Sequence, residues 1–274
     1  MTINKPPRIL GVGDNTVDQY LHLRRMFPGG NAVNVPVLAH RYGAEASYIG
    51  WLGDDRYGRL ILDALRQEGI DTSHCRVIAG GTNAHCEVNL VDGDRVFGAS
   101  SAGVTRQIAL TDEDFAFAGQ FDLVHSSVYS HIVAQLPQLR NAAQRLSFDF
   151  SQGWKRPYLE QVLPFTTFAF LSYPDQSQSE CESLMRWIKA QGPEVVVVTR
   201  GKEGALAFGG ERIVQQGIVE ANVVDTLGAG DAFIARFLVE YLRGKAINES
   251  MALAAQSAAE TCGYYGAFGY GLEF

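Results

Sequence analysis

Several features that define large protein classes are scarce or missing in this sequence. Only four of its 274 residues are cysteine, and no two of them form a CxxC pair. No stretch approaches the ~18 uninterrupted apolar residues of a membrane-spanning helix, and residues 1–8 lack the apolar block of a signal peptide. We therefore expect reduced thiols, a cytoplasmic location and no membrane partner.

Positive charge is also in short supply. The chain has 23 Lys and Arg residues against 30 Asp and Glu residues, which gives a formal net charge of −7. Affinity for nucleic acid depends largely on Lys and Arg side chains that neutralise phosphates. The sequence thus predicts no nucleic-acid partner.

Two common nucleotide-binding motifs are missing as well. A P-loop needs Ser or Thr after its Gly-Lys step, whereas Gly201-Lys202 is followed by Glu203. The pair Gly11 and Gly13 is not completed by a third glycine, because position 16 is threonine. Neither a P-loop enzyme nor a Rossmann dehydrogenase is indicated.

What the chain does contain is an alternation of short apolar runs with helical periodicity. Hydrophobic residues make up 46% and charged residues 19%, which is the balance of a folded domain. The pattern predicts strands at 8–13, 47–53, 121–125, 146–150, 167–171 and 194–199, and helices at 31–42, 55–68, 132–145 and 177–190. Runs buried on both faces with helices between them indicate an α/β fold with a mostly parallel central sheet.

One region interrupts this alternation. Residues 84–91 and 95–98 are joined by Asp92-Gly93-Asp94, and an Asp-Gly step favours a tight hairpin. Such a hairpin could serve as a lid or be a surface elaboration of the sheet. We expect one main domain over residues 1–274 with a small β lid.

The segment with the clearest chemistry is Asp225-Thr226-Leu227-Gly228-Ala229-Gly230-Asp231, which is followed by a helical run. Small residues at a helix start let backbone N–H groups turn toward an anion such as a phosphoryl group. An aspartate at this place is either an N-cap or, beside an anion, a base for an attacking hydroxyl.

This segment resembles the C-terminal signature of the ribokinase/PfkB-like carbohydrate kinases. Pro28-Gly-Gly-Asn-Ala-Val-Asn-Val35 resembles their N-terminal signature, and the turn at 198–204 follows in the family's order. The resemblance implies a ribokinase-like three-layer α/β/α sandwich whose small β lid is formed from about 14–30 and 82–101. It also implies ATP as phosphoryl donor, Mg²⁺ as cofactor and a small-molecule sugar or sugar-amine substrate.

Within that family, four segments are most similar to the fructoselysine 6-kinases: 13–18, 29–35, 94–98 and 148–151. This likeness implies phosphorylation of the 6-hydroxyl of a fructosamine. Fructose, ribose or a nucleoside such as adenosine remain alternative acceptors. A catalytically silent sugar-binding protein of the same fold is the alternative from another class, although binding alone needs no base.

The resemblance assigns roles to individual positions. Asp231 would be the base, with backbone donors from Gly228, Ala229 and Gly230. Acceptor contacts would come from Asp18, Gly30, Asn31 and Asn34. The nucleotide would lie against Thr199, Arg200, Gly201, Gly204, Gly228 and Gly230.

Some family features are altered or left open. The Asn-x-x-Glu element that organises magnesium-bound water is replaced by Ser172-Tyr173-Pro174-Asp175, which leaves Asp175 as the candidate. Where ribokinase relatives often have lysine, this sequence has Asn31. K⁺ near Asp225 and Thr226 is an open alternative, and edge pairing of the lid predicts a homodimer.

Overall fold

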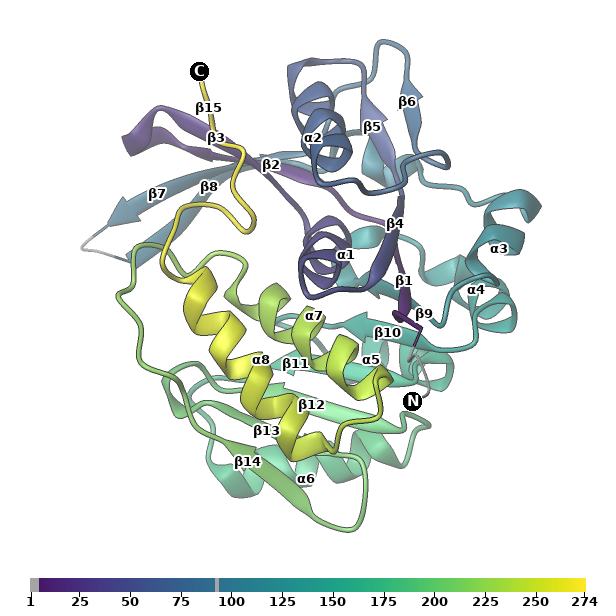
Figure 1. Cartoon of the computed structure of the whole chain (residues 1–274), viewed down its shortest axis with the longest axis vertical. Helices are drawn as coiled ribbons and strands as arrows, with labels where there is room; N and C mark the ends of the chain where they lie inside the picture. The colour runs from purple at the N-terminus through teal and green to yellow at the C-terminus, as the bar shows by residue number, and fades with distance from the viewer. Residues whose placement is uncertain (1–4, 92–93) are drawn as a thin grey trace.

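An eight-stranded sheet forms the centre of the molecule in a computed structural model that describes residues 5–91 and 94–274 (Figure 1). The six strands at one side run parallel, and the last two are antiparallel to their neighbours. Their spatial order is β4 (Glu45–Ile49), β1 (Arg8–Val12), β9 (Leu123–Ser127), β10 (Leu146–Asp149), β11 (Phe168–Ser172), β12 (Val195–Thr199), β13 (Ala205–Phe208) and β14 (Ile213–Gln216). The predicted α/β class with a mostly parallel sheet is confirmed.

Both faces of this sheet are covered, which explains the continuous apolar runs in its strands. In β1, Ile9 packs into one core while Leu10 and Val12 pack into the other. The first core includes α1 (Asn31–Arg41), α2 (Arg56–Gln67), α7 (Ala229–Leu242) and α8 (Ile247–Thr261), and the second includes α3 (Asp112–Ala118), α4 (Leu136–Ala142), α5 (Arg156–Val162) and α6 (Gln178–Lys189). In Figure 1, α1, α7 and α8 cross the face toward the viewer.

A five-stranded sheet, called the second sheet below, extends from one edge of this core (Figure 1). Its order is β15 (Leu272–Glu273), β3 (Arg25–Gly29), β2 (Thr16–Tyr20), β7 (His85–Val91) and β8 (Asp94–Ser101). The two segments predicted to form the lid therefore contribute strands to the same sheet. The sequence did not indicate that β15 would join this sheet as well. The predicted turn at Asp92-Gly93 lies outside the described residues.

Two sequence predictions need correction. The strand expected at 47–53 ends at Ile49, and residues 51–53 form β5 (Trp51–Gly53), which pairs with β6 (Arg76–Ile78) in a separate sheet. Where the chain leaves the central sheet, Asn15 Nδ2 donates to the Trp51 carbonyl and Arg76 N donates to the Gly50 carbonyl. The helix expected at 132–145 is a 3₁₀ turn followed by α4, which stops where Ala143 becomes extended.

Within the described ranges, no helix combines the length and the apolar character that crossing a membrane requires.

Candidate active site

The carboxyl ends of the parallel strands bring polar side chains to one edge of the central sheet. Asp14 follows β1 closely, Ser127 ends β9 and Asp149 ends β10. Since ligands of parallel α/β sheets bind beyond the carboxyl ends of the strands, this edge is the expected place for a site. The second sheet starts here too, because β1 leads directly through residues 13–15 into β2.

Asp231 lies at this edge in the first turn of α7, opposite the first turn of α1. Asn31 Nδ2 donates to Asp231 Oδ1 at 2.7 Å, and Asn34 Nδ2 donates to Asp231 Oδ2 at 2.6 Å. Removal from solvent raises the pKa of Asp231 to about 6, against the lowering effect of both amides, and the charge of Asp14 raises it further. Three residues from two separate sequence motifs thus meet through their side chains.

The backbone before Asp231 turns sharply at Gly228, the residue that precedes α7. Gly228 has a φ of 79°, and a Cβ there would lie 2.6 Å from the Cα of Ala267, so only glycine fits. The amides of the first turn of a helix have no intrahelical partners. Beside Gly230, a Cβ would meet nothing within 4 Å, so space is open next to these donors. Asp231 is therefore adjacent to a helix start with open space beside its backbone amides.

A second carboxyl group, Asp149, shares this amide network. The same Asn31 Nδ2 donates to Asp149 Oδ2 at 3.0 Å, and Ser151 N donates to Asp149 Oδ1 at 2.9 Å. Removal from solvent raises the pKa of Asp149 to about 7, with further increases from the charges of Asp231 and Asp14. The sequence reasoning gave Asp149 no role. Its position at the end of an apolar strand was the available signal.

The orientation of the Asn31 amide is set by His125, which is fully buried in β9. Burial lowers the pKa of His125 to about 3, so the ring is neutral. Its Nε2 lies 2.8 Å from Asn31 Oδ1, which can only accept, so Nε2 carries the hydrogen. Nδ1 then accepts from Ser147 Oγ at 2.9 Å. This chain fixes the Asn31 NH₂ group toward the two carboxylates.

Asp14 and Tyr129 complete the group of side chains that sequence reasoning missed. Asp14 Oδ1 accepts from Ser127 Oγ at 2.7 Å and from Ser130 Oγ at 2.9 Å. The Tyr129 residue is 53% exposed, and its hydroxyl lies 2.9 Å from Ser151 Oγ. Its pKa is raised by partial burial and by the charges of Asp149, Asp14 and Asp231, so Tyr129 lies within electrostatic range of all three carboxylates.

The remaining predicted acceptor residues lie beside this network. Gly30 precedes α1 with a φ of 103°, and a Cβ there would lie 2.6 Å from the Cα of Asn15. Asp18 belongs to β2 of the second sheet, and its carboxylate lies directly against Gly29, where a Cβ would approach Oδ2 to 2.5 Å. The second sheet thus places one acidic side chain next to the N-terminus of α1.

The predicted nucleotide residues follow β12. Thr199 ends the strand, and Gly201 begins a 3₁₀ turn that leads into Gly204. Arg200 is only 7% exposed, donates to the Gln176 carbonyl at 3.0 Å and pairs with Glu203. Its guanidinium is therefore engaged in holding this turn, and its predicted contact with a phosphate stays a prediction.

Asp175 and Asp225 are the two carboxylates predicted to lie near bound cations. Asp175 is exposed just beyond β11, and within the described ranges no three His, Cys, Asp or Glu side chains cluster as metal ligands would. The Asp225 carboxylate accepts hydrogen bonds from Leu227 N, Gly266 N and the Tyr20 hydroxyl. These bonds hold the Asp225 carboxylate in place, and K⁺ near Asp225 and Thr226 stays a prediction.

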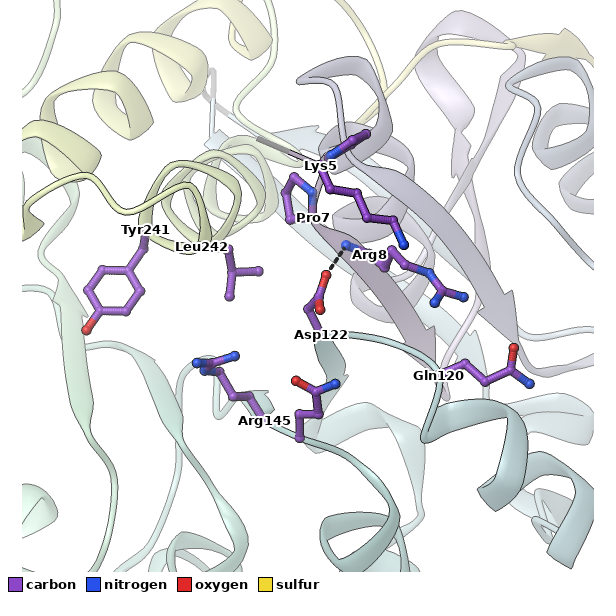
Figure 2. A pocket seen from close by; sticks show the side chains of 10 residues that line it. Lys5, Pro7, Arg8, Gln120, Asp122, Arg145, Tyr241 and Leu242 are labelled. Carbon is purple, nitrogen blue, oxygen red and sulfur yellow. Dashed lines mark hydrogen bonds between the residues drawn. The ribbon is translucent and has the colours of Figure 1, made fainter. Parts of the chain in front are cut away.

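A separate cavity of about 380 Å³ lies at the opposite edge of the sheet, where Figure 2 shows Arg8, Asp122, Arg145 and Leu242 in its lining. Arg8 begins β1 and Arg145 precedes β10, so this cavity faces the amino ends of the parallel strands. It contains none of the predicted site residues.

Comparison with known proteins agrees with this geometry. The family model described as pfkB family carbohydrate kinase matches residues 12–269. The chain belongs to that family. As a pfkB carbohydrate kinase it is an enzyme of the sugar phosphotransferase class, which confirms the resemblance found in the sequence.

Two curated relatives of this pfkB kinase match over nearly the whole chain. Fructosamine kinase FrlD of Bacillus subtilis (strain 168) is 42% identical over 271 residues, which cover 97% of this chain and 95% of the relative. Fructoselysine 6-kinase of Escherichia coli (strain K12) is 40% identical over 257 residues, which cover 94% of this chain and 98% of the relative.

The fold is also that of a solved ribokinase. The Arabidopsis thaliana ribokinase complexed with ribose and ATP matches with a TM-score of 0.82 and 21% identity, covering 96% of this chain and 95% of that chain. The predicted ribokinase-like fold is thereby confirmed.

Proposed function

We propose that this pfkB kinase transfers the γ-phosphoryl group of ATP to the 6-hydroxyl of a fructosamine such as fructoselysine. The observation that carries the proposal is the Asp231 carboxylate, held by Asn31 and Asn34 beside the open start of α7. The two relatives named for fructosamine or fructoselysine phosphorylation, at 42% and 40% identity, support this acceptor.

In the proposed reaction, Asp231 accepts the proton of the acceptor hydroxyl as its oxygen bonds to the γ-phosphorus. The bond from that phosphorus to the bridging oxygen of ADP breaks, and ADP leaves. The backbone amides of Gly228, just before α7, and of Ala229 and Gly230, in its first turn, then donate to the oxygens on which negative charge develops. Asp231 is suited to this role because it is ionised above a pKa of about 6.

We propose that Mg²⁺ is held mainly by the phosphates of the nucleotide, with few protein ligands. Magnesium bound to a nucleotide commonly needs only one or two carboxylates, with phosphates and waters as further ligands. When bound, it neutralises charge on the phosphates. Asp175, exposed beyond β11, is the residue proposed to reach it through water.

The acceptor is proposed to lie between α1 and the second sheet. Asn31 and Asn34 line it from α1, Gly30 allows close approach of the backbone, and Asp18 faces it from β2. The second sheet would act as the lid, since closure over the sugar excludes water, which competes as a phosphoryl acceptor.

The deciding experiment is coupled measurement of ADP release with Mg-ATP and each of four acceptors: fructoselysine, fructose, ribose and adenosine. We expect the highest kcat/KM with fructoselysine and its loss in Asp231→Asn, which should remain folded. Turnover of another acceptor alone would replace the proposed substrate. Unchanged turnover in Asp231→Asn would remove Asp231 as the base.

We also propose a cytoplasmic homodimer joined through the second sheet. Its strand β8 lies at the edge of the sheet, and Val96 and Phe97 are 45% and 59% exposed there. An exposed apolar edge strand is a ready template for pairing with a second copy.

A further inference from the structure

We propose that Asp149 binds the positively charged amine of the acceptor and thereby selects aminated sugars over neutral ones. The inference rests on the proposed function and names the residue that would give it specificity. Asp149 is distinct from the predicted acceptor contacts, all of which lie on β2 or at the start of α1.

Asp149 lies close to Asp231 because the same Asn31 amide nitrogen donates to both carboxylates. Asn31 Nδ2 lies 2.7 Å from Asp231 Oδ1 and 3.0 Å from Asp149 Oδ2. The two carboxylate oxygens cannot be further apart than the sum of these distances. One small sugar can therefore offer a hydroxyl to Asp231 and another polar group to Asp149.

The charge around Asp149 calls for a cation. The charge of Asp14 raises the pKa of both Asp149 and Asp231, and the charge of Asp231 raises the pKa of Asp149 as well. Across the part of the chain that the structure describes, the ion pairs of Arg and Lys go to other acids. An ammonium group would offset this uncompensated charge, whereas an anionic acceptor would be repelled.

A separate observation is that the site contains a buried hydrogen-bond acceptor without a donor. Asn34 is 4% exposed and its Nδ2 is bound to Asp231, but its Oδ1 has no partner. A buried amide oxygen without a donor is unfavourable, so a ligand that brings O–H or N–H groups is expected here.

Tyr129 adds a surface that suits an amine. Its hydroxyl is held by Ser151, whose backbone N–H binds Asp149, and more than half of the residue is exposed. The face of a tyrosine ring attracts ammonium groups. Asp149 and Tyr129 would then contact the same cation.

The alternative is that Asp149 only helps to hold Asn31. In that case its loss would lower activity with every acceptor to the same extent, because Asn31 also holds Asp231. A role in amine binding predicts a change in preference, which is a different readout.

The test compares fructoselysine with fructose, which has a hydroxyl where the fructosamine has its amine. In Asp149→Asn, we expect the ratio of kcat/KM for fructoselysine to that for fructose to fall by about tenfold or more, because a charge-assisted hydrogen bond is lost. Asp122→Asn is the matched control, since Asp122 lies in the distant cavity and binds Arg8 N. An equal loss with both sugars would overturn the proposal.

Calorimetry on the wild-type protein gives a readout that does not depend on a folded variant. Affinity for fructoselysine should rise with pH through about 7, as Asp149 ionises, while affinity for fructose should not. A flat profile for fructoselysine contradicts amine binding by Asp149 even if the sugar is phosphorylated. Phosphorylation of neutral sugars alone would contradict the proposed fructosamine kinase function as well. Failure of amine binding by Asp149 and failure of the proposed function therefore give different results.

Discussion

In the proposed mechanism, the Asp231 carboxylate can accept a proton only while it is ionised. Its pKa is raised to about 6, so it is ionised above that pH and becomes protonated as the pH falls through it. Asp149, with a pKa near 7, would need to be ionised only for an aminated acceptor. The two carboxyl groups should therefore shape activity differently for different sugars.

We expect kcat/KM for fructose to decline below about pH 6, and kcat/KM for fructoselysine to begin its decline near pH 7. The measurement is ADP release across this range with both sugars, with coupling enzymes shown not to limit the rate. Superimposable profiles would remove Asp149 from acceptor binding, and a rate that stays constant well below pH 6 would remove Asp231 as the base.

His125 offers a second test at the level of single residues. In His125→Leu, Asn31 Oδ1 and Ser147 Oγ lose their partner, and a buried unsatisfied group typically costs about 1–3 kcal/mol. We expect lower stability in urea unfolding and a lower kcat, because the Asn31 amide is then free to turn away from both carboxylates. His125→Gln keeps a donor to Asn31 and should restore much of the activity. If both variants are equally active, orientation by His125 is unimportant.

Residues of the candidate site were predictable only in part, for a physical reason. Asn31, Asn34 and Asp231 stand in local motifs at helix starts, where residue type and spacing carry the signal. Asp149 and His125 join them only because β9 and β10 are neighbours in the sheet. Strand order is a property of the folded chain, so no local pattern could show which strand ends would meet.

Among the elements, β2 has a contact that links the second sheet to the start of α7. The Tyr20 hydroxyl donates to Asp225 Oδ2, and Asp225 also receives the amides of Leu227 and Gly266. The ring of Tyr20 packs edge to face against Phe27 and Tyr265. A strand of the second sheet and the turn before α7 are thus joined through one carboxylate.

Tyr20→Phe should loosen this connection while keeping the ring. Hydrogen bonds to charged groups contribute about 1.5–3 kcal/mol, so we expect a lower melting temperature and faster amide hydrogen exchange at residues 225–230. The control is Tyr158→Phe, because the buried Tyr158 hydroxyl has no hydrogen-bond partner. Equal effects of the two substitutions would show that the contact with Asp225 contributes little.

Most helices and parallel strands could be predicted from local sequence patterns, but their boundaries could not always be. The six parallel strands of the central sheet and α1, α2, α6 and α7 were recognisable from their apolar patterns, whereas β13 and β14 were not predicted, and Gly43 marked the end of α1 correctly. The break after β4 was missed because both sides of it are apolar, and only the contacts of Asn15 and Arg76 separate β5 from β4. Apolar character alone does not say which sheet a residue joins.

At the scale of the whole molecule, the free edge of β8 determines how copies could assemble. Phe97 is 59% exposed on this strand. We expect Phe97→Asp to convert the proposed dimer to a monomer, because charge on an edge strand opposes pairing. Sedimentation over a range of concentrations measures this. A wild-type mass equal to the monomer at every concentration would contradict the dimer.

The position of β15 has a practical consequence for following the enzyme at work. The chain returns at its end to pair with β3, and Phe274 N donates to the Arg24 carbonyl. A fluorophore attached after Phe274 would therefore travel with the second sheet. One attached at Lys5, beside the distant cavity, would stay with the central sheet. Energy transfer between the two dyes would report the proposed closure of the second sheet in real time without altering any of the predicted acceptor residues.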